Sequence, residues 1–222
     1  VHYGPGPSEC IRMAMEGDFD CIQGNCDRAV ARDRNYTGEV HDNPQWRRQA
    51  SEMLSYTLDS VSPAEKKWLK KLPEELRFQV GRTDIHCVHG LPSSQDQGLP
   101  PDAAEDIYDS ILNRSGARIL VCGLTHRPTV IRRPGGLILN PGSVGGGTLP
   151  SGGTFMVVTF SEQGDLEVET MQFKYDPDLL SEGYARAGTG DIFLKCLRLG
   201  RDQRGYWHTD DLQWRQKWAL NS

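Results

Sequence analysis

The segment ARILVCG, residues 117–123, is the most strongly predicted strand of the chain. Its unbroken aliphatic run is typical of a strand in a sheet that is covered on both faces. The stretch Gly-Leu-Thr-His, which ends at His126, follows the strand directly. Binding sites in open α/β sheets form at the carboxyl ends of strands, so functional side chains are expected first in this stretch.

The sequence on either side of this strand predicts a mixed α/β domain. A helical pattern over residues 102–116 precedes it and ends at Gly116. Two extended segments, LRFQV and IHCVHG, come before that helix. Short strands punctuated by Gly and Pro follow, as in an antiparallel sheet; they cover residues 129–133, 136–140, 154–160 and 165–173.

The first third of the chain is predicted to be mainly helical. Ser8 is placed to cap a short helix, and FDCIQ, residues 19–23, has the pattern of a short buried strand. Apolar residues fall on one helical face over residues 43–58, and Ser62 begins a second helix over residues 62–72. After residue 176 the signal weakens, and the two remaining helical candidates are IFLKCLRLG and the Trp-rich segment YWHTDDLQWRQKWAL.

Composition restricts the possible partners. The chain has 222 residues with 25 Lys and Arg against 30 Asp and Glu, so its net charge is −5. A mildly acidic chain lacks the basic face that nonspecific binding to nucleic acid or to an anionic membrane needs. No apolar run approaches the ~20 residues of a membrane span. We therefore expect neither a membrane nor a specific nucleic acid as partner.

The six cysteines predict a reducing environment. No two of them form a CxxC pair, which argues against a zinc ribbon or a thioredoxin-type motif. Several lie in apolar runs such as DCIQ, HCVH and LVCG, where cysteine behaves as a small apolar residue. We interpret them as reduced thiols of a cytoplasmic protein.

Three predicted strands end in polar residues of one chemical type. Asn25 follows FDCIQ, His89 follows IHCV, and His126 follows RILVC. An amide oxygen and two imidazoles would suit a borderline metal ion such as Mn, Fe, Ni or Zn. A single histidine at a strand end is more often a structural residue, but the three signals together are more specific. The remaining histidines, His2, His41, His86 and His208, are interpreted as structural or surface residues.

The order GN-x-D, VHG, G-x-T-H and NPGSVG resembles the calcineurin-like metallophosphoesterases, most closely their small bacterial and archaeal phosphodiesterase branch. The segments VHYGPGPSEC, GNCDRAV and THRPTV resemble further stretches of that branch. The resemblance covers residues 1–176 as a phosphoesterase domain and leaves 177–222 as a C-terminal extension. It implies a four-layer α/β/β/α sandwich with a two-metal site between its sheets.

The resemblance also implies roles for individual residues. Asn25 and His89 would bind the second metal ion, and His126 would bind the first. Asp27 would orient neighbouring groups, and Arg28 would either help to hold the substrate phosphate or be a surface charge. The cofactors would be two divalent metal ions, Mn, Fe, Ni or Zn, that activate water to hydrolyse a phosphorylated small molecule or a phosphodiester. The NPGS stretch, residues 140–143, would lie beside the site in a structural role.

The chain departs from the family pattern in three places. The D-x-H and GD aspartates are absent, and the pattern puts them upstream of Val1, so the chain is interpreted as N-terminally truncated and lacking the first strand. Leu124 replaces the first histidine of G-H-x-H and cannot coordinate a metal. Cys26 stands where many relatives have a histidine. We therefore expect the chain as given to be inactive or nearly so. We also expect unpaired strand edges beside ARILVCG, which would reduce solubility.

Two other functional classes stay open. Leu124 favours a catalytically degenerate phosphoesterase-like binding or scaffold protein. Alternatively, Cys26 is the nucleophile of a hydrolase that uses His89 or His126 as its base. The C-terminal segment with Trp207, Trp214 and Trp218 either packs on the domain or forms a subunit contact in a homo-oligomer.

Overall fold

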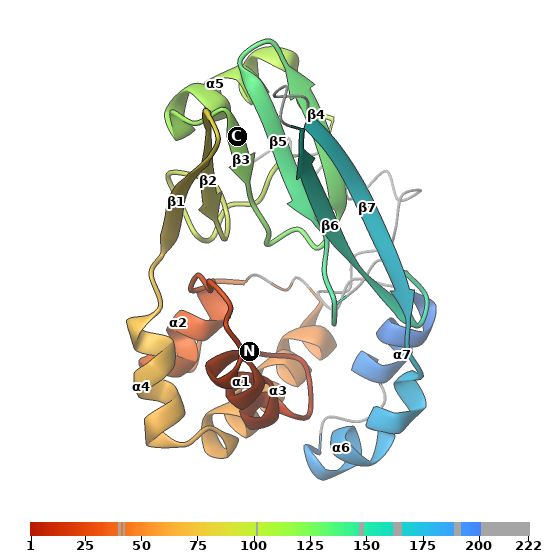
Figure 1. Ribbon diagram of the computed structural model, residues 1–222. Coiled ribbons are helices and arrows are strands. Elements are labelled where there is room, and N and C mark those ends of the chain that lie inside the picture. The colour runs from red at the N-terminus through yellow and green to blue at the C-terminus, as the bar shows by residue number, and fades with distance from the viewer. Residues whose placement is uncertain are drawn as a thin grey trace.

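Two β-sheets face each other in one half of the molecule (Figure 1). The computed structural model describes residues 1–39, 41, 43–100, 102–146, 149–161, 166–188 and 192–200. The larger sheet has the order β1-β2-β3-β5-β4, and β6 and β7 form an antiparallel pair. The strands are β1 (Glu75–Val80), β2 (Thr83–Val88), β3 (Ile119–Val121), β4 (Pro128–Arg133), β5 (Gly136–Pro141), β6 (Gly152–Phe160) and β7 (Leu166–Lys174).

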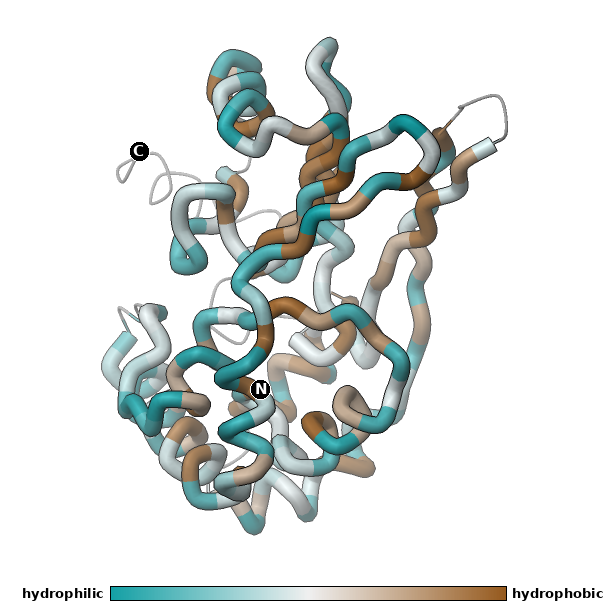
Figure 2. The backbone as a smooth tube through the Cα atoms, turned by 60° about the vertical axis from the view of Figure 1, so that its left-hand side comes forward, coloured by the Kyte–Doolittle hydropathy of each residue, from teal (hydrophilic) through white to brown (hydrophobic). Residues whose placement is uncertain are grey.

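Both faces of the larger sheet are covered. Because side chains alternate along a strand, Met156 and Val158 of β6 point together toward Ile119 and Leu139 of the larger sheet. On the other face, helix α5 (Glu105–Ser115) packs Leu112 and its neighbours against the apolar side chains of the central strands. Figure 2 shows this apolar stretch along the middle of the sheet. The aliphatic run around β3 is therefore buried on both sides, as its sequence predicts.

Four helices form a layer at the carboxyl ends of the parallel strands (Figure 1). They are α1 (Pro7–Glu16), α2 (Asn25–Ala31), α3 (Pro44–Ser60) and α4 (Pro63–Lys71). Local signals begin two of them: the Asn43 side chain accepts hydrogen bonds at the start of α3, and Ser62 and Glu65 form a capping box on α4. Their apolar faces meet in one cluster that contains Ile11, Leu54 and other buried residues.

The described part of the C-terminal extension packs on this helical layer. It comprises the 3-10 helix η1 (Pro177–Leu180), α6 (Ser181–Arg186) and α7 (Ile192–Leu199). Tyr184 and Phe193 share a core cluster with Tyr3 and Met53. The Tyr184 hydroxyl donates a hydrogen bond of 2.9 Å to the Tyr3 carbonyl oxygen. The predicted Trp-rich segment with Trp207, Trp214 and Trp218 lies outside the described residues.

Two local predictions are wrong. Residues 19–23 form no strand, because a strand needs a partner and this segment runs past the helices as irregular chain; Gln23 N donates to Pro73 O at 2.8 Å. Ser8 does not cap α1, which begins after Gly6. The Ser8 hydroxyl lies instead 2.7 Å from a Glu65 carboxylate oxygen, and so connects α1 with α4.

The predicted unpaired edges beside β3 are also absent. β3 pairs in parallel with β2 on one side and with β5 on the other. The edges of the sheet are therefore β1 and β4. The predicted antiparallel pairing holds for β4 with β5 and for β6 with β7. Within the described ranges, no helix combines the length and the apolar character that a membrane span requires.

Candidate functional site

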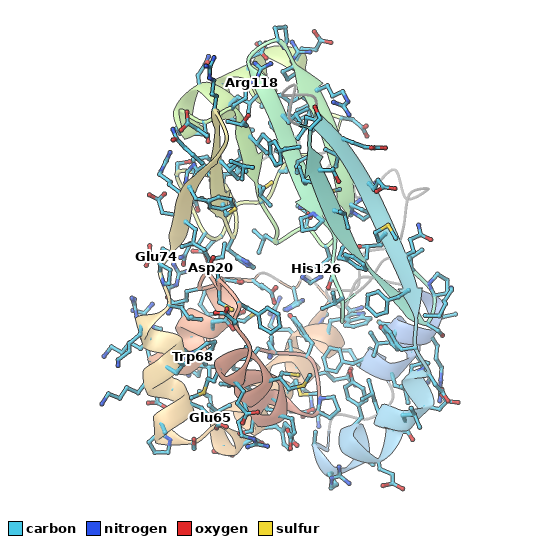
Figure 3. All side chains as sticks on the ribbon, viewed as in Figure 1. Asp20, Glu65, Trp68, Glu74, Arg118 and His126 are labelled. Carbon is cyan, nitrogen blue, oxygen red and sulfur yellow. The ribbon has the colours of Figure 1, made fainter. Side chains whose placement is uncertain are left out.

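Three parallel strands end opposite the first turn of α2. β2, β3 and β5 run in the same direction, and Figure 1 shows their carboxyl ends pointing at the helical layer. His89 directly follows β2, and Asn25 is the first residue of α2. Figure 3 shows His126, from the loop after β3, at the same level between the sheet and the helices. The fold therefore places the three predicted ligands between the larger sheet and the helical layer.

Asn25 and His89 are in direct contact. His89 Nε2 and Asn25 Oδ1 are 2.9 Å apart. Asn25 is buried, and its Nδ2 donates to the Thr37 carbonyl oxygen at 3.0 Å, so its Oδ1 is the atom that faces His89. Because Oδ1 can only accept, His89 Nε2 carries the proton in this arrangement. The contact joins residues 64 positions apart.

Gly24 makes room for this contact. A Cβ atom at Gly24 would lie 2.9 Å from His89 Cε1 and 3.0 Å from His89 Nδ1. These distances are shorter than any ordinary contact, so a side chain at this position would displace the imidazole ring. The glycine of GN-x-D therefore allows α2 to approach the end of β2 closely.

Asp27 holds the turn that carries Asn25. Its Oδ2 accepts a hydrogen bond of 2.9 Å from Gly24 N. The Asp27 carboxyl group therefore fixes the backbone next to Asn25.

His89 is neutral at pH 7. Burial is the largest cause that lowers its pKa. The positive charge of Arg28 lowers it further, and the carboxylates of Asp27 and Asp96 act in the opposite direction. A neutral imidazole has one lone pair to offer, as a metal ligand requires. Nε2 can offer that lone pair only if its proton moves to Nδ1.

The loop after β3 is held by Asn140, a fully buried residue at the end of β5. Asn140 Nδ2 donates to Gly123 O at 2.7 Å and to Thr125 Oγ1 at 3.0 Å. Gly123 N in turn donates to His89 O at 2.7 Å. The NPGS stretch therefore positions the β3 loop against the end of β2.

The β3 loop also has an unusual backbone. Leu124 has a φ of 62° and His126 has a φ of 59°. This left-handed conformation is uncommon for residues other than glycine, and it is costly for a bulky residue such as leucine. Leu124 is buried and offers no ligand atom.

The described residues do not complete a two-metal centre. No three His, Cys, Asp or Glu side chains among them come together in a way that could hold a metal ion. Asn25 and His89 supply two neutral donor atoms in contact, whereas Zn and Mn sites take about four to six ligands, usually with carboxylates or several imidazoles. The donor set on this chain is therefore only part of the set that two divalent ions need.

Comparison with known proteins identifies the family. Residues 3–163 match the family model described as the calcineurin-like phosphoesterase superfamily domain. The chain belongs to this superfamily. The match spans the GN-x-D, VHG and G-x-T-H motifs and the NPGS loop, so the motif order that suggested the resemblance is confirmed at the level of the superfamily. A search of curated proteins found no match.

Solved structures confirm the fold. A hypothetical protein, PH1004 from Pyrococcus horikoshii, is similar with a TM-score of 0.71 and 20% sequence identity over 90% of this chain and 82% of its own. A metallophosphoesterase from Sphaerobacter thermophilus is similar with a TM-score of 0.66 and 20% identity over 90% of this chain and 84% of its own. The predicted mixed α/β metallophosphoesterase fold is thus confirmed.

In this calcineurin-like phosphoesterase, Arg28 is engaged by a loop that sequence reasoning did not connect with it. Its Nη1 donates to Gln95 Oε1 at 2.7 Å. Its Nη2 lies 2.7 Å from Asp96 Oδ1 and 2.9 Å from Asp96 Oδ2. The contact joins positions 68 residues apart, and no local sequence signal points to it.

The remaining candidates lie elsewhere or stay predictions. His86 is fully buried and contacts Ser115 Oγ at 3.0 Å, so its predicted structural role is confirmed. His41 is buried rather than on the surface, and burial lowers the pKa of His2 to about 3. His208 is outside the described residues. Cys26 is half-buried in the first turn of α2.

Proposed function

We propose that this chain is a phosphoester hydrolase of the calcineurin-like type whose reaction takes place where β2 and β3 end opposite α2. The observation that carries the proposal is the contact between Asn25 Oδ1 and His89 Nε2, at 2.9 Å and at the carboxyl ends of parallel strands. His126 lies at the same level and is proposed as a further ligand.

The other residues have binding and orienting roles in this proposal. Asp27 keeps the Gly24–Asn25 turn in place through its bond to Gly24 N. Arg28 binds a phosphate group, because a guanidinium can donate two parallel hydrogen bonds to phosphate oxygens. In this family, divalent ions such as Mn, Fe, Ni or Zn supply the charge that stabilises a reacting phosphate. No step is assigned to such ions here, because the donor set on this chain is incomplete.

The proposed substrate is a phosphorylated small molecule or a phosphodiester. The family match supports phosphoester chemistry, and Arg28 supports an anionic substrate. The proposed location is the cytoplasm, because no disulfide links the six cysteines, all of which are described. Such cysteines are typical of a reducing compartment.

We further propose that the chain as given has weak metal-dependent activity. The test is hydrolysis of bis-p-nitrophenyl phosphate with Mn²⁺, with EDTA as control and a known metallophosphoesterase assayed in parallel. Loss of one supporting residue at a metal site typically costs about 10- to 100-fold, so missing ligands should cost at least about 100-fold. Full, EDTA-sensitive activity would show that other carboxylates complete the site and that the proposed impairment is wrong.

A second candidate function is a non-catalytic binding or scaffold protein of the same fold. The observation that favours it is Leu124, a buried residue without a ligand atom in a left-handed conformation. The test is Leu124→His, because histidine tolerates this conformation better than leucine and offers a lone pair. A gain of EDTA-sensitive hydrolysis in Leu124→His would argue against the scaffold function.

A further inference from the structure

The loop that follows His89 reaches back to Arg28. Residues 91–98, here called the 91–98 loop, follow the end of β2 and contact Arg28 of α2. Both oxygens of Asp96 contact the same guanidinium nitrogen, at 2.7 and 2.9 Å, and Gln95 contacts the other terminal nitrogen. The side chain predicted to hold a phosphate is therefore occupied by a carboxylate of the chain itself.

The base of the loop is held independently of this contact. Leu91 N donates to Ser94 O at 2.9 Å, and Ser94 N donates to Leu91 O at 2.9 Å. At the far end Leu99 is buried at 5% exposure in the cluster around α5. Asp96 itself is exposed. The tip can therefore leave Arg28 while the base of the loop keeps its structure.

The chain provides space for the Asp96 carboxylate. Gly38 has a φ of +95°, and a Cβ there would lie 2.8 Å from Asp96 Oδ1. Because this position carries only hydrogen, the carboxylate can lie between Gly38 and Arg28.

The ion pair borders the candidate site. Arg28 N donates to Gly24 O at 2.9 Å, and a Cβ at Gly24 would lie 2.9 Å from His89 Cε1. Arg28 is also in the same short helix as Asn25 and Asp27. An anion that replaced Asp96 on Arg28 would therefore lie beside the Asn25–His89 contact.

We propose that Asp96 occupies on Arg28 the position that a substrate phosphate takes, so that the 91–98 loop controls access to this anion site. This inference rests on the proposed function, in which Arg28 binds phosphate. A carboxylate and a phosphate both accept charge-assisted hydrogen bonds from a guanidinium, so one can replace the other. The exposed carboxylate is a weak enough partner to be displaced. The loop thus selects for ligands that compete better than a carboxylate, such as phosphate groups.

The test measures binding of inorganic phosphate to the EDTA-treated chain by titration calorimetry. Asp96→Asn keeps the shape of the side chain and removes its charge. We expect phosphate to bind Asp96→Asn about 1.5- to fivefold more tightly than the wild type, the range for losing an exposed ion pair. Arg28→Gln should bind phosphate more weakly than the wild type.

A matched control is available elsewhere in the chain. Asp109 pairs with Arg133 through two contacts of 2.9 Å, and its side chain is 41% exposed, compared with 42% for Asp96. It belongs to α5, on the far side of the larger sheet from β6 and β7. Asp109→Asn removes the same charge from an exposed aspartate–arginine pair away from the site. Arg133 keeps a second carboxylate, Glu105, at 2.9 Å, and phosphate affinity should stay unchanged.

Three results would overturn the proposal: an equal gain in Asp109→Asn, no gain in Asp96→Asn, or unfolding of Asp96→Asn, which would make Asp96 a structural residue. Gly38→Ala gives a second reading, because its Cβ displaces the carboxylate without changing any charge. Alanine is strained at φ +95°, so the fold of this variant is checked first; it too should tighten phosphate binding. These measurements use no metal. Failed hydrolysis with tight phosphate binding would refute only the proposed function, and absent phosphate binding would refute this inference.

Discussion

Gly24→Ala should destabilise the chain through one contact, the one between Asn25 and His89. The backbone at Gly24 has φ −90° and ψ 173°, which alanine adopts without strain. The new Cβ would lie 2.9 Å from His89 Cε1, so the ring has to move. The effect of the substitution therefore comes from the imidazole and not from the backbone.

The magnitude follows from two costs and one gain. Moving the ring loses the hydrogen bond to Asn25, which costs about 0.5–1.5 kcal/mol. Turning the ring away from its preferred rotamer costs about 0.5–1.5 kcal/mol more. Alanine in place of glycine restricts the unfolded chain and stabilises by about 0.4–1 kcal/mol. We expect the free energy of unfolding to fall by about 1 kcal/mol in Gly24→Ala.

The assay is urea unfolding of a double-mutant cycle. In a His89→Ala background the obstacle is gone, so Gly24→Ala should stabilise the chain by about 0.4–1 kcal/mol. The coupling between the two sites is then about 2 kcal/mol. Gly135→Ala is the control, because nothing lies within 4 Å of a Cβ at that position. Additive effects of Gly24→Ala and His89→Ala would refute the contact.

Three further predictions concern the surroundings of the site. Asn140→Ala leaves the carbonyl oxygen of Gly123 without its 2.7 Å donor and should lower the free energy of unfolding by about 2–3 kcal/mol in urea; a loss below about 0.5 kcal/mol would contradict this. The pKa of His2, lowered by burial to about 3, means that the unfolded chain binds a proton that the folded chain does not, so stability should be full above pH 6.5 and fall toward pH 3. His2→Phe should flatten this dependence, as unfolding at several pH values would show. Leu124→His should keep or raise the unfolding midpoint, because Leu124 has a φ of 62°; a clear loss would mean that burial of Leu124 outweighs its backbone strain.

Local patterns predicted most elements of this fold because helices and hairpins depend on neighbouring residues. The capping box of Ser62 and Glu65 begins α4, and Gly116, with a φ of 66°, ends α5. β1 and β2 are joined by a two-residue turn, so their register is local as well. The same reasoning fails for residues 19–23, where an apolar run has no strand to pair with. A strand depends on a partner that the segment itself does not contain.

The candidate site was also predicted only in part from the sequence. The motif order by itself indicated the superfamily and named Asn25, His89 and His126, because each follows a recognisable apolar run. It did not show that Asn25 Oδ1 faces His89, since that orientation depends on the bond from Asn25 Nδ2 to Thr37 O. Nor did it show that the Arg28 guanidinium donates hydrogen bonds to Asp96, which is 68 residues away.

The sequence alone therefore determined the periodic elements, the family and the residue types of the site. The tertiary structure decided how the strands pair and which atoms of the site residues are in contact. It also decided that the carboxylate of Asp96 pairs with Arg28. The physical reason is the distance along the chain over which each interaction acts. Propensity, capping and alternation act within a few residues. Strand pairing and side-chain contacts between distant segments form only when folding brings those segments together.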